Sequence, residues 1–195
     1  RGPGAPAPAA APIRSVRARG RPGAGDTPSG PSPREPAMPT ARPFLGALAF
    51  VVGCEAVGLA GAAVTNPGSD WYRALAKPPF QPPAWVFGPA WTLLYALMGL
   101  AAWRVWRRRP APGVRRALGL FAAQLALNAA WTPLFFGAHA VGAALAILVA
   151  LTALVAWTIV AFRRVDRPAA ALLLPYLAWL LFATALNASI LRLNG

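Results

Sequence analysis

The stretch WYRALAKPPFQPPAWVFGPAW, residues 71–91, joins two long apolar segments and contains five prolines and six aromatic residues. Proline restricts the backbone and lowers the entropy that a loop loses when it becomes ordered. Such a connection can close over an apolar cavity without a regular fold. An aromatic anchor at the membrane interface is the alternative, because Trp and Tyr are enriched there. Trp91 favours the cavity, since it lies inside the following apolar segment and in line with Tyr95.

Five apolar segments of the chain have the length of a membrane helix. A bilayer core about 30 Å thick needs about 20 apolar residues per helix, and hydrophobic residues make up 57% of the chain. The segments are residues 44–64, 84–103, 117–136, 140–162 and 169–191. The sequence therefore predicts an all-α membrane protein, a five-transmembrane-helix bundle with a lid loop between the first and second helices.

The remaining residues lie mainly in an N-terminal tail. Residues 1–37 contain nine prolines and six arginines but few large apolar residues, so we expect a disordered tail before a membrane domain at residues 38–195. An Arg-rich, acid-poor tail is typical of an organelle transit peptide. The interpretation that we favour is that Met38 begins the native protein and that the tail is upstream sequence.

The charges of the chain are arranged around the apolar segments, so the net charge of +14 indicates a membrane protein and no nucleic-acid partner. Nine arginines lie in the connections between the second and third and between the fourth and fifth segments. The opposite side has Arg73, Lys77 and Arg192. The positive-inside rule predicts a cytoplasmic N-terminus and an outside C-terminus. With one cysteine and one histidine, the chain can hold neither an internal disulfide nor a multi-histidine metal site.

Small residues recur every three or four positions in the first and third segments, a pattern that lets another helix approach closely. The neighbour is either another helix of the same chain or a second protomer, and we predict a homodimer through one of these faces. They comprise Gly46, Ala49, Gly53, Ala56, Ala60 and Ala63 in the first segment, and Gly119, Ala123, Ala126 and Ala130 in the third. Glu55 is the mid-span carboxylate of the first segment, and either joins two helices or contacts a proton or ligand.

Aromatic and amide side chains share faces of three segments. They are Trp91, Tyr95 and Met98 in the second, Gln124, Asn128, Trp131 and Thr132 in the third, and Tyr176, Trp179, Ala183 and Asn187 in the fifth. This combination suits a pocket for a flat, largely apolar ligand with polar edges. Helix–helix contacts and interfacial belts are the alternative. Pro89, Pro133 and Pro175 are predicted to interrupt three helices.

Three motifs strongly resemble the tryptophan-rich sensory protein and translocator protein (TspO/MBR) family, once called peripheral benzodiazepine receptors. They are WYRALAKPPFQPPAWVFGPAWTLLYALMG (71–99), QLALNAAWTPLFFGA (124–138) and PYLAWLLFATALNASILRLN (175–194). The resemblance covers residues 44–194. It implies a bundle, often dimeric, that binds porphyrins, notably protoporphyrin IX and haem, and hydrophobic drugs. The porphyrin would be a ligand, and no cofactor would be required.

The resemblance also implies a site. The lid residues would be Trp71, Tyr72 and Lys77. The residues that match pocket-lining positions of the family are Trp91, Asn128, Trp131, Trp179 and Ala183. Tyr95 joins them because it shares a helix face with Trp91. The animal proteins carry a cholesterol motif with a central Tyr, and Ala188 stands in that place here. A bacterial origin explains this departure, so we expect a bacterial cell membrane.

Three functions are open at this point. The first is a membrane sensor or carrier of tetrapyrroles in porphyrin homeostasis and stress response, with Lys77 and Arg73 as cations for the propionates. The second is a light- and oxygen-dependent porphyrin-degrading enzyme that uses Trp91 and Trp179, although the sequence has no conventional catalytic constellation. The third is a proton-coupled transporter that uses Glu55. No internal repeat supports it.

An axial haem ligand is not expected. Haem iron needs a donor such as His or Cys. His139 is predicted to lie in a surface turn between the third and fourth segments, and Cys54 is the single thiol of the chain. We therefore predict no tight axial haem site.

Overall fold

The computed structural model describes residue 2 and residues 42–195. The predicted tail, residues 1–37, lies outside the described residues except for residue 2, and so does Met38. Every regular element in residues 42–195 is helical, in agreement with the all-α prediction. The elements are α1 (Arg42–Val64), α2 (Asp70–Ala74), the 3₁₀ turn η1 (Ala84–Val86), α3 (Phe87–Trp106), α4 (Val114–Thr132), the wide turn η2 (Pro133–Gly137), α5 (Val141–Val165), α6 (Arg167–Leu172) and α7 (Leu174–Asn194).

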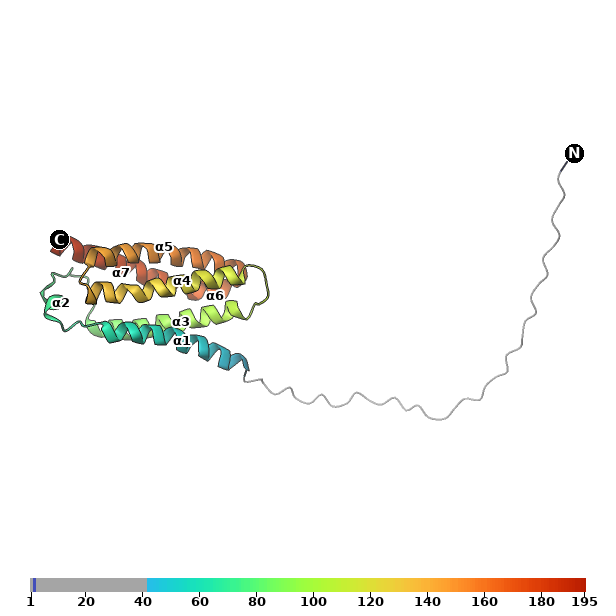
Figure 1. Ribbon diagram of the computed structural model, residues 1–195, viewed down its shortest axis with the longest axis horizontal. Coiled ribbons are helices and arrows are strands. Elements are labelled where there is room, and N and C mark those ends of the chain that lie inside the picture. The colour runs from blue at the N-terminus through green and yellow to red at the C-terminus, as the bar shows by residue number, and fades with distance from the viewer. Residues whose placement is uncertain (1, 3–41) are drawn as a thin grey trace. The chain divides into compact units, whose positions relative to one another are not determined.

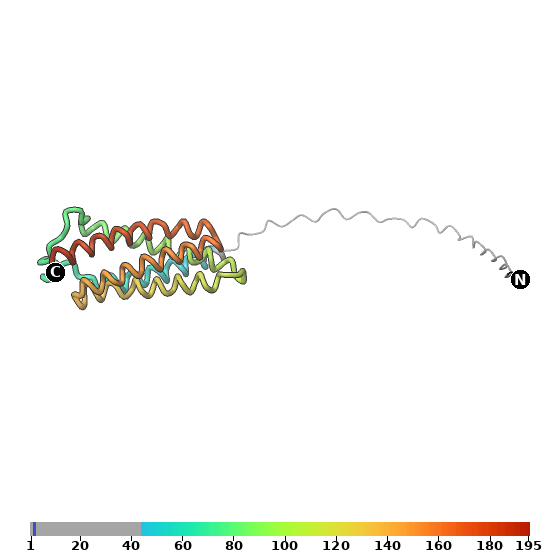
Figure 2. The backbone as a smooth tube through the Cα atoms, turned by 90° about the horizontal axis from the view of Figure 1, so that it is seen from above, coloured from blue at the N-terminus to red at the C-terminus, as the bar shows by residue number. Residues whose placement is uncertain are grey.

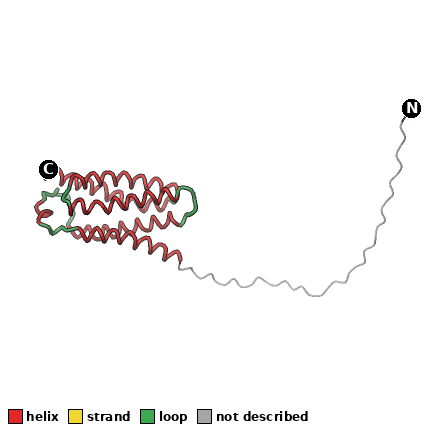
Figure 3. The backbone as a smooth tube through the Cα atoms, in the orientation of Figure 1, coloured by secondary structure: helices red, strands yellow, loops and turns green. Residues whose placement is uncertain are grey.

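Five helical segments in residues 42–195 are long and apolar enough to cross a membrane, which confirms the predicted number. They are Phe44–Val64, Ala84–Trp106, Val114–Gly137, Val141–Val165 and Arg167–Asn194. The helices run beyond the apolar stretches, mostly where arginines follow. Cationic side chains in the last turn of a helix interact favourably with its dipole, as at Arg104 in α3 and Arg163 in α5. Figures 1 and 3 show these helices side by side, with the loops at the two ends of the bundle.

Prolines explain the irregular points in two of the spans. Pro133 opens η2, in which the Ala138 amide donates to the Pro133 carbonyl oxygen at 2.8 Å and so widens the turn. Pro175 has no amide proton to donate to a carbonyl oxygen of the preceding turn. The fifth span is accordingly divided at Leu173 into α6 and α7. Pro89 differs from the prediction. It lies in the first turn of α3, where an amide has no partner within the helix, so it does not interrupt that helix.

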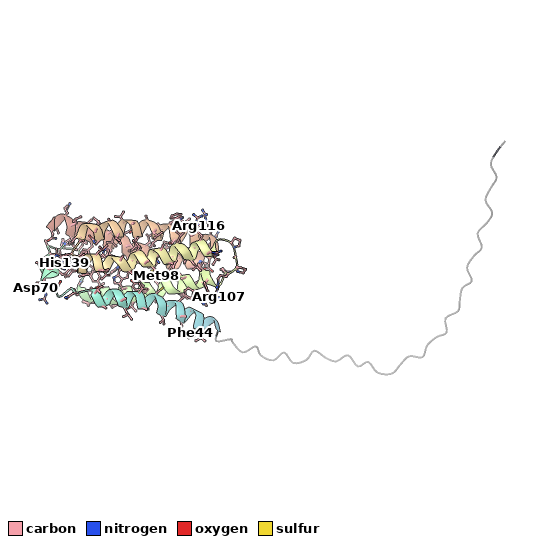
Figure 4. The ribbon with its side chains drawn as sticks, viewed as in Figure 1. Phe44, Asp70, Met98, Arg107, Arg116 and His139 are labelled. Carbon is pink, nitrogen blue, oxygen red and sulfur yellow. The ribbon has the colours of Figure 1, made fainter. Side chains whose placement is uncertain are left out.

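The helices pack mainly as neighbours of α3 and α5: α1 lies against α3, α4 against α5, and α5 against α7. The view from above shows the same lengthwise arrangement (Figure 2). Met98 is fully buried in α3 and lies near mid-length of the bundle (Figure 4). At Gly99 the backbone of α1 comes so close that a Cβ atom would lie 2.5 Å from the Val51 Cα atom. Glycine is therefore required there for α1 to reach α3.

An ion-pair junction joins α3 to the turn between α5 and α6. The buried Asp166 carboxylate contacts the guanidinium groups of Arg104 and Arg108, each at 3.1 Å. It also caps α6 by accepting a hydrogen bond from the Ala169 amide at 2.8 Å. Burial by itself would raise the pKa of Asp166, but the Ala169 amide and the two guanidinium groups hold that pKa below its usual value.

Candidate functional site

A hydrogen-bonded trio of buried side chains lies at the centre of the candidate site. The Tyr95 hydroxyl of α3 donates to Asn128 Oδ1 of α4 at 2.6 Å, and Asn128 Nδ2 donates to the Tyr176 hydroxyl oxygen of α7 at 2.7 Å. All three side chains are buried. Because a buried polar group without a partner is costly, this trio fixes the rotation of three helices about their axes.

The two tyrosine rings of the trio pack with two indole rings, and the four together form what we call the inner cluster, Trp91, Tyr95, Tyr176 and Trp179. The Trp91 ring lies 5.5 Å from Tyr95, 6.3 Å from Tyr176 and 6.2 Å from Trp179, measured between ring centroids. These separations are those of favourable aromatic pairs. Helix α1 closes the cluster at Gly58, where a Cβ atom would lie 2.5 Å from the Tyr95 ring.

A second aromatic group lies where the loop that joins α1 to α3 meets α4 and η2. We call it the lid cluster; it comprises Trp71, Tyr72, Trp131, Phe135 and Phe136. Phe135 is buried and stacks on Trp131, with ring centroids 5.1 Å apart. The Trp71 and Phe135 rings form an edge-to-face pair with centroids 5.6 Å apart. Tyr72 lies 5.3 Å from Phe136, and burial raises the pKa of Tyr72 although its hydrogen bond with Gln81 acts in the opposite direction. The predicted lid thus packs onto α4 and η2.

The loop is held down by polar contacts as well as by aromatic rings. Asn194, near the end of α7, pairs with the Ala76 backbone: its Oδ1 accepts from the Ala76 amide at 2.8 Å, and its Nδ2 donates to the Ala76 carbonyl at 2.9 Å. The Lys77 ammonium donates to the carbonyl oxygens of Tyr72, Arg73 and Leu75. Lys77 therefore supports the fold of the lid through the backbone of its own loop.

The predicted site residues divide between these two groups. Trp91 and Trp179 lie beside the trio, to which Tyr95 and Asn128 belong. The lid residues Trp71 and Tyr72 share the lid cluster with Trp131. Ala183 follows Trp179 by one helical turn and packs against the main core. Phe182, also on α7, contacts Trp179 at 5.6 Å and Phe80 of the loop at 6.4 Å, so it joins the two groups.

Two residues that are not among the predicted ligand-binding residues contribute to the site. Tyr176 completes the trio, and its position in line with Trp179 was the available signal. Asn194 holds the lid from 118 residues away, and no local pattern marks it. Pairings of this kind depend on how α7 is placed along the bundle.

Some buried polar atoms near the lid have no hydrogen-bond partner among the described residues. They are Trp131 Nε1 and both polar atoms of the Asn187 side chain, which is 2% exposed. Leu186 and Ile190, which flank Asn187 on α7, belong to the same packed group as Phe135. The lid end of the bundle therefore combines flat apolar surfaces with uncommitted amide and indole groups.

Two ionisable candidates remain, Glu55 and His139. Glu55 is half-buried on α1, and its Oε1 atom has no partner among the described residues. His139 is exposed, as predicted, and stacks on Trp71 at 4.0 Å, so its ring supports the lid from the side. Figure 4 places His139 and Asp70 at the same end of the bundle. Within the described part of the chain, no three His, Cys, Asp or Glu side chains are grouped so as to hold a metal ion.

Comparison with known proteins decides the family. The model of the TspO/MBR family matches residues 50–193. The chain belongs to the TspO/MBR family. It is 42% identical to the translocator protein of Ovis aries over 150 residues, which cover 75% of this chain and 89% of that protein. It is 43% identical to the tryptophan-rich protein TspO of Chlorobaculum tepidum over 153 residues, covering 75% and 95%. It is 44% identical to the tryptophan-rich sensory protein of Cereibacter sphaeroides over 147 residues, covering 75% and 90%.

The TspO/MBR match spans the lid, the trio and both aromatic clusters, and it includes every predicted site residue. Asn194, which ties down the lid, lies one residue beyond it. Identity to the animal and bacterial relatives is nearly equal. The sequence therefore shows the family but does not favour relatives named translocator protein over relatives named sensory protein.

Proposed function

We propose that this membrane protein binds a tetrapyrrole, protoporphyrin IX or haem, and other flat hydrophobic ligands, as a sensor or carrier in porphyrin homeostasis and stress response. The observation that carries the proposal is the buried trio of Tyr95, Asn128 and Tyr176, whose phenol rings pack with the indole rings of Trp91 and Trp179. Phe182 connects these rings to the loop between α1 and α3. A porphyrin has apolar faces that stack on such rings and polar edges that need hydrogen bonds. In this proposal the porphyrin is a ligand, and no resident cofactor is needed.

Entry of so large a ligand requires the lid to open, because the rings beneath it are in mutual contact. The contacts that must break are those of Trp71 and Tyr72 with η2 and of Asn194 with the loop. Trp131 and Asn187 then supply the uncommitted polar groups for the edge of the ligand. Of the two cations expected for the propionates, Arg73 is exposed on α2 whereas the Lys77 ammonium is bound to loop carbonyls, so Arg73 is our preferred partner for a propionate.

The test is a titration of the detergent-purified protein with protoporphyrin IX in the dark, followed by tryptophan quenching. We expect saturable binding that weakens about tenfold or more in Trp91→Phe and Trp179→Phe, because each loses part of a large contact surface. Trp157→Phe is the matched control, since Trp157 is 52% exposed on α5. Binding that does not saturate, or that weakens equally in the control, contradicts the proposal.

A light-dependent porphyrin-degrading activity is the second candidate, and the 6.2 Å separation of Trp91 and Trp179 favours it. Two oxidisable indoles would then lie against the same bound ligand. Illumination of the dark complex in air, with spectra recorded over time, separates the two functions. A product that forms in the unaltered protein and is absent from both Trp→Phe variants at saturating porphyrin supports the enzyme, whereas unchanged spectra support the binder.

We further propose a homodimer in a bacterial cell membrane, with the N-terminus cytoplasmic and the C-terminus outside. The small residues of α1 support the dimer, because Ala49, Gly53, Ala56 and Ala60 are exposed and leave room for a second helix. The arginine-rich end of the bundle supports the orientation. The mass of the protein in nanodiscs tests the first point, and a reporter fused to the C-terminus tests the second.

A further inference from the structure

A shallow, open surface groove lies at the arginine-rich end of the bundle, far from the lid. It is lined by Val160, Arg163, Arg164 and Arg167 and has a volume of about 440 Å³. Val160, Arg163 and Arg164 lie three and four residues apart on one face of α5, and Arg167, the first residue of α6 after the extended Asp166, lines the same groove; together we call them the stripe. The stripe is half-exposed at Val160 and exposed at all three arginines. Figure 4 shows Arg107 and Arg116 at this end.

The charge around the groove is strongly unbalanced. The two connections at this end contain nine arginines and one carboxylate, Asp166. That carboxylate is already bound by Arg104 and Arg108. Within the part of the chain that the structure describes, no carboxylate forms an ion pair with the three arginines of the groove. The groove therefore presents three guanidinium groups that favour an anion, and phosphate oxygens suit guanidinium geometry.

The apolar residue of the groove belongs to a membrane-spanning helix. Val160 lies within the membrane span Val141–Val165, five residues before its end. Trp157 lies one turn earlier and is 52% exposed, as expected of an interfacial aromatic residue. The Arg116 guanidinium of α4 lies 5.6 Å from the Trp157 ring, within reach of a cation–π contact. The surface thus has an apolar floor below and cations above, at the depth where a headgroup meets its chains.

We propose that this groove binds the phosphodiester headgroup of an anionic phospholipid in the adjacent leaflet, with its acyl chains lying along Trp157 and Val160. The proposal does not depend on the porphyrin function, because the groove and the lid are at opposite ends of the bundle. It also exceeds the general attraction of basic ends to anionic membranes, since it assigns the contact to one stripe of α5 and α6 and not to the arginines as a set.

The test uses the full chain, delipidated in detergent, with dioleoyl phosphatidylglycerol as the probe and native mass spectrometry to count bound lipid. The groove variant carries Arg163→Gln, Arg164→Gln and Arg167→Gln. The matched control removes the same charge from the same end through Arg107→Gln, Arg109→Gln and Arg115→Gln. Each arginine near the surface contributes about fivefold to the affinity for an anionic lipid. We therefore expect the affinity to fall about 100-fold in the groove variant and less than about tenfold in the control.

Three results would overturn the proposal. Equal losses in the two triple variants would mean that only the summed charge attracts the lipid. Equal affinity for phosphatidylcholine would remove the preference for an anionic headgroup, and displacement of the lipid by an equal concentration of inorganic phosphate would identify a site for soluble anions. If the triple groove variant does not fold, the single Arg164→Gln variant takes its place, with an expected loss of about fivefold, and an unchanged affinity then counts against the site.

Discussion

Asn128 offers the most direct test of how the bundle is held in register. Replacing it by leucine removes both hydrogen bonds of the trio but keeps a side chain of similar length. The hydroxyls of Tyr95 and Tyr176 are then left in an environment where these residues are 6% and 0% exposed. A buried hydroxyl that loses its partner costs about 1–3 kcal/mol, and hydrogen bonds between membrane helices average about 0.6 kcal/mol. We therefore expect Asn128→Leu to lower the free energy of unfolding by about 1.5–3 kcal/mol.

A further variant tests the cause of this loss of stability. If the cost comes from unpaired hydroxyls, removing them as well should restore most of the stability. The triple variant Tyr95→Phe, Asn128→Leu, Tyr176→Phe has no polar atom left in the trio, and we expect it within about 1 kcal/mol of the unaltered protein. Unfolding by sodium dodecyl sulfate in mixed micelles, followed by circular dichroism, measures all of these differences on one scale.

A second buried asparagine supplies the control. Asn187 is 2% exposed, and its amide has no partner among the described residues. Asn187→Leu should therefore be neutral or stabilising, because it removes polar atoms that gain nothing from burial. The reasoning is refuted if Asn128→Leu unfolds at the same detergent fraction as the unaltered protein, or if the triple variant loses as much as the three single changes added together.

Three further predictions concern packing, the lid and pH. Gly99→Ala should destabilise the bundle by about 1–3 kcal/mol because it forces α1 away from α3, whereas Gly53→Ala, which meets nothing within 4 Å, should change it by less than about 1 kcal/mol; equal midpoints in the same unfolding assay would contradict this. Asn194→Ala should speed proteolysis within residues 71–83 several-fold without changing the global midpoint, because only the lid loses two hydrogen bonds. The depressed pKa of Asp166 contributes stability above the unfolded value near 4, and this is lost as pH falls through the folded pKa. Asp166→Asn should therefore cost about 2 kcal/mol at pH 7 and flatten the acid limb of the stability curve, and an unchanged acid limb would argue against the ion-pair junction.

The number of membrane spans and the irregular turns at prolines could be predicted from the sequence. Apolar run length set the number of spans, because a bilayer of fixed thickness accepts helices of one length. Proline positions located the irregular turns at Pro133 and Pro175, since a missing amide proton acts at its own place in the helix. Pro89 was placed less well, because the effect of a proline depends on whether a helix has already begun, and the start of α3 is set by the preceding turn.

The sequence by itself determined an all-helical membrane bundle, a stiff aromatic loop and a set of aromatic and amide side chains at membrane depth. Tertiary structure alone decided which of these side chains meet. It joined Tyr95, Asn128 and Tyr176 across three helices. It also directed the Lys77 ammonium toward the backbone carbonyl groups of its own loop. It also bound Asn194 to a residue 118 positions away. The physical reason is that these spans are apolar on all sides, so their hydrophobic pattern does not record how each helix is rotated or how far it is shifted along its neighbour. Only close packing and the need to satisfy each buried polar group determine those two quantities.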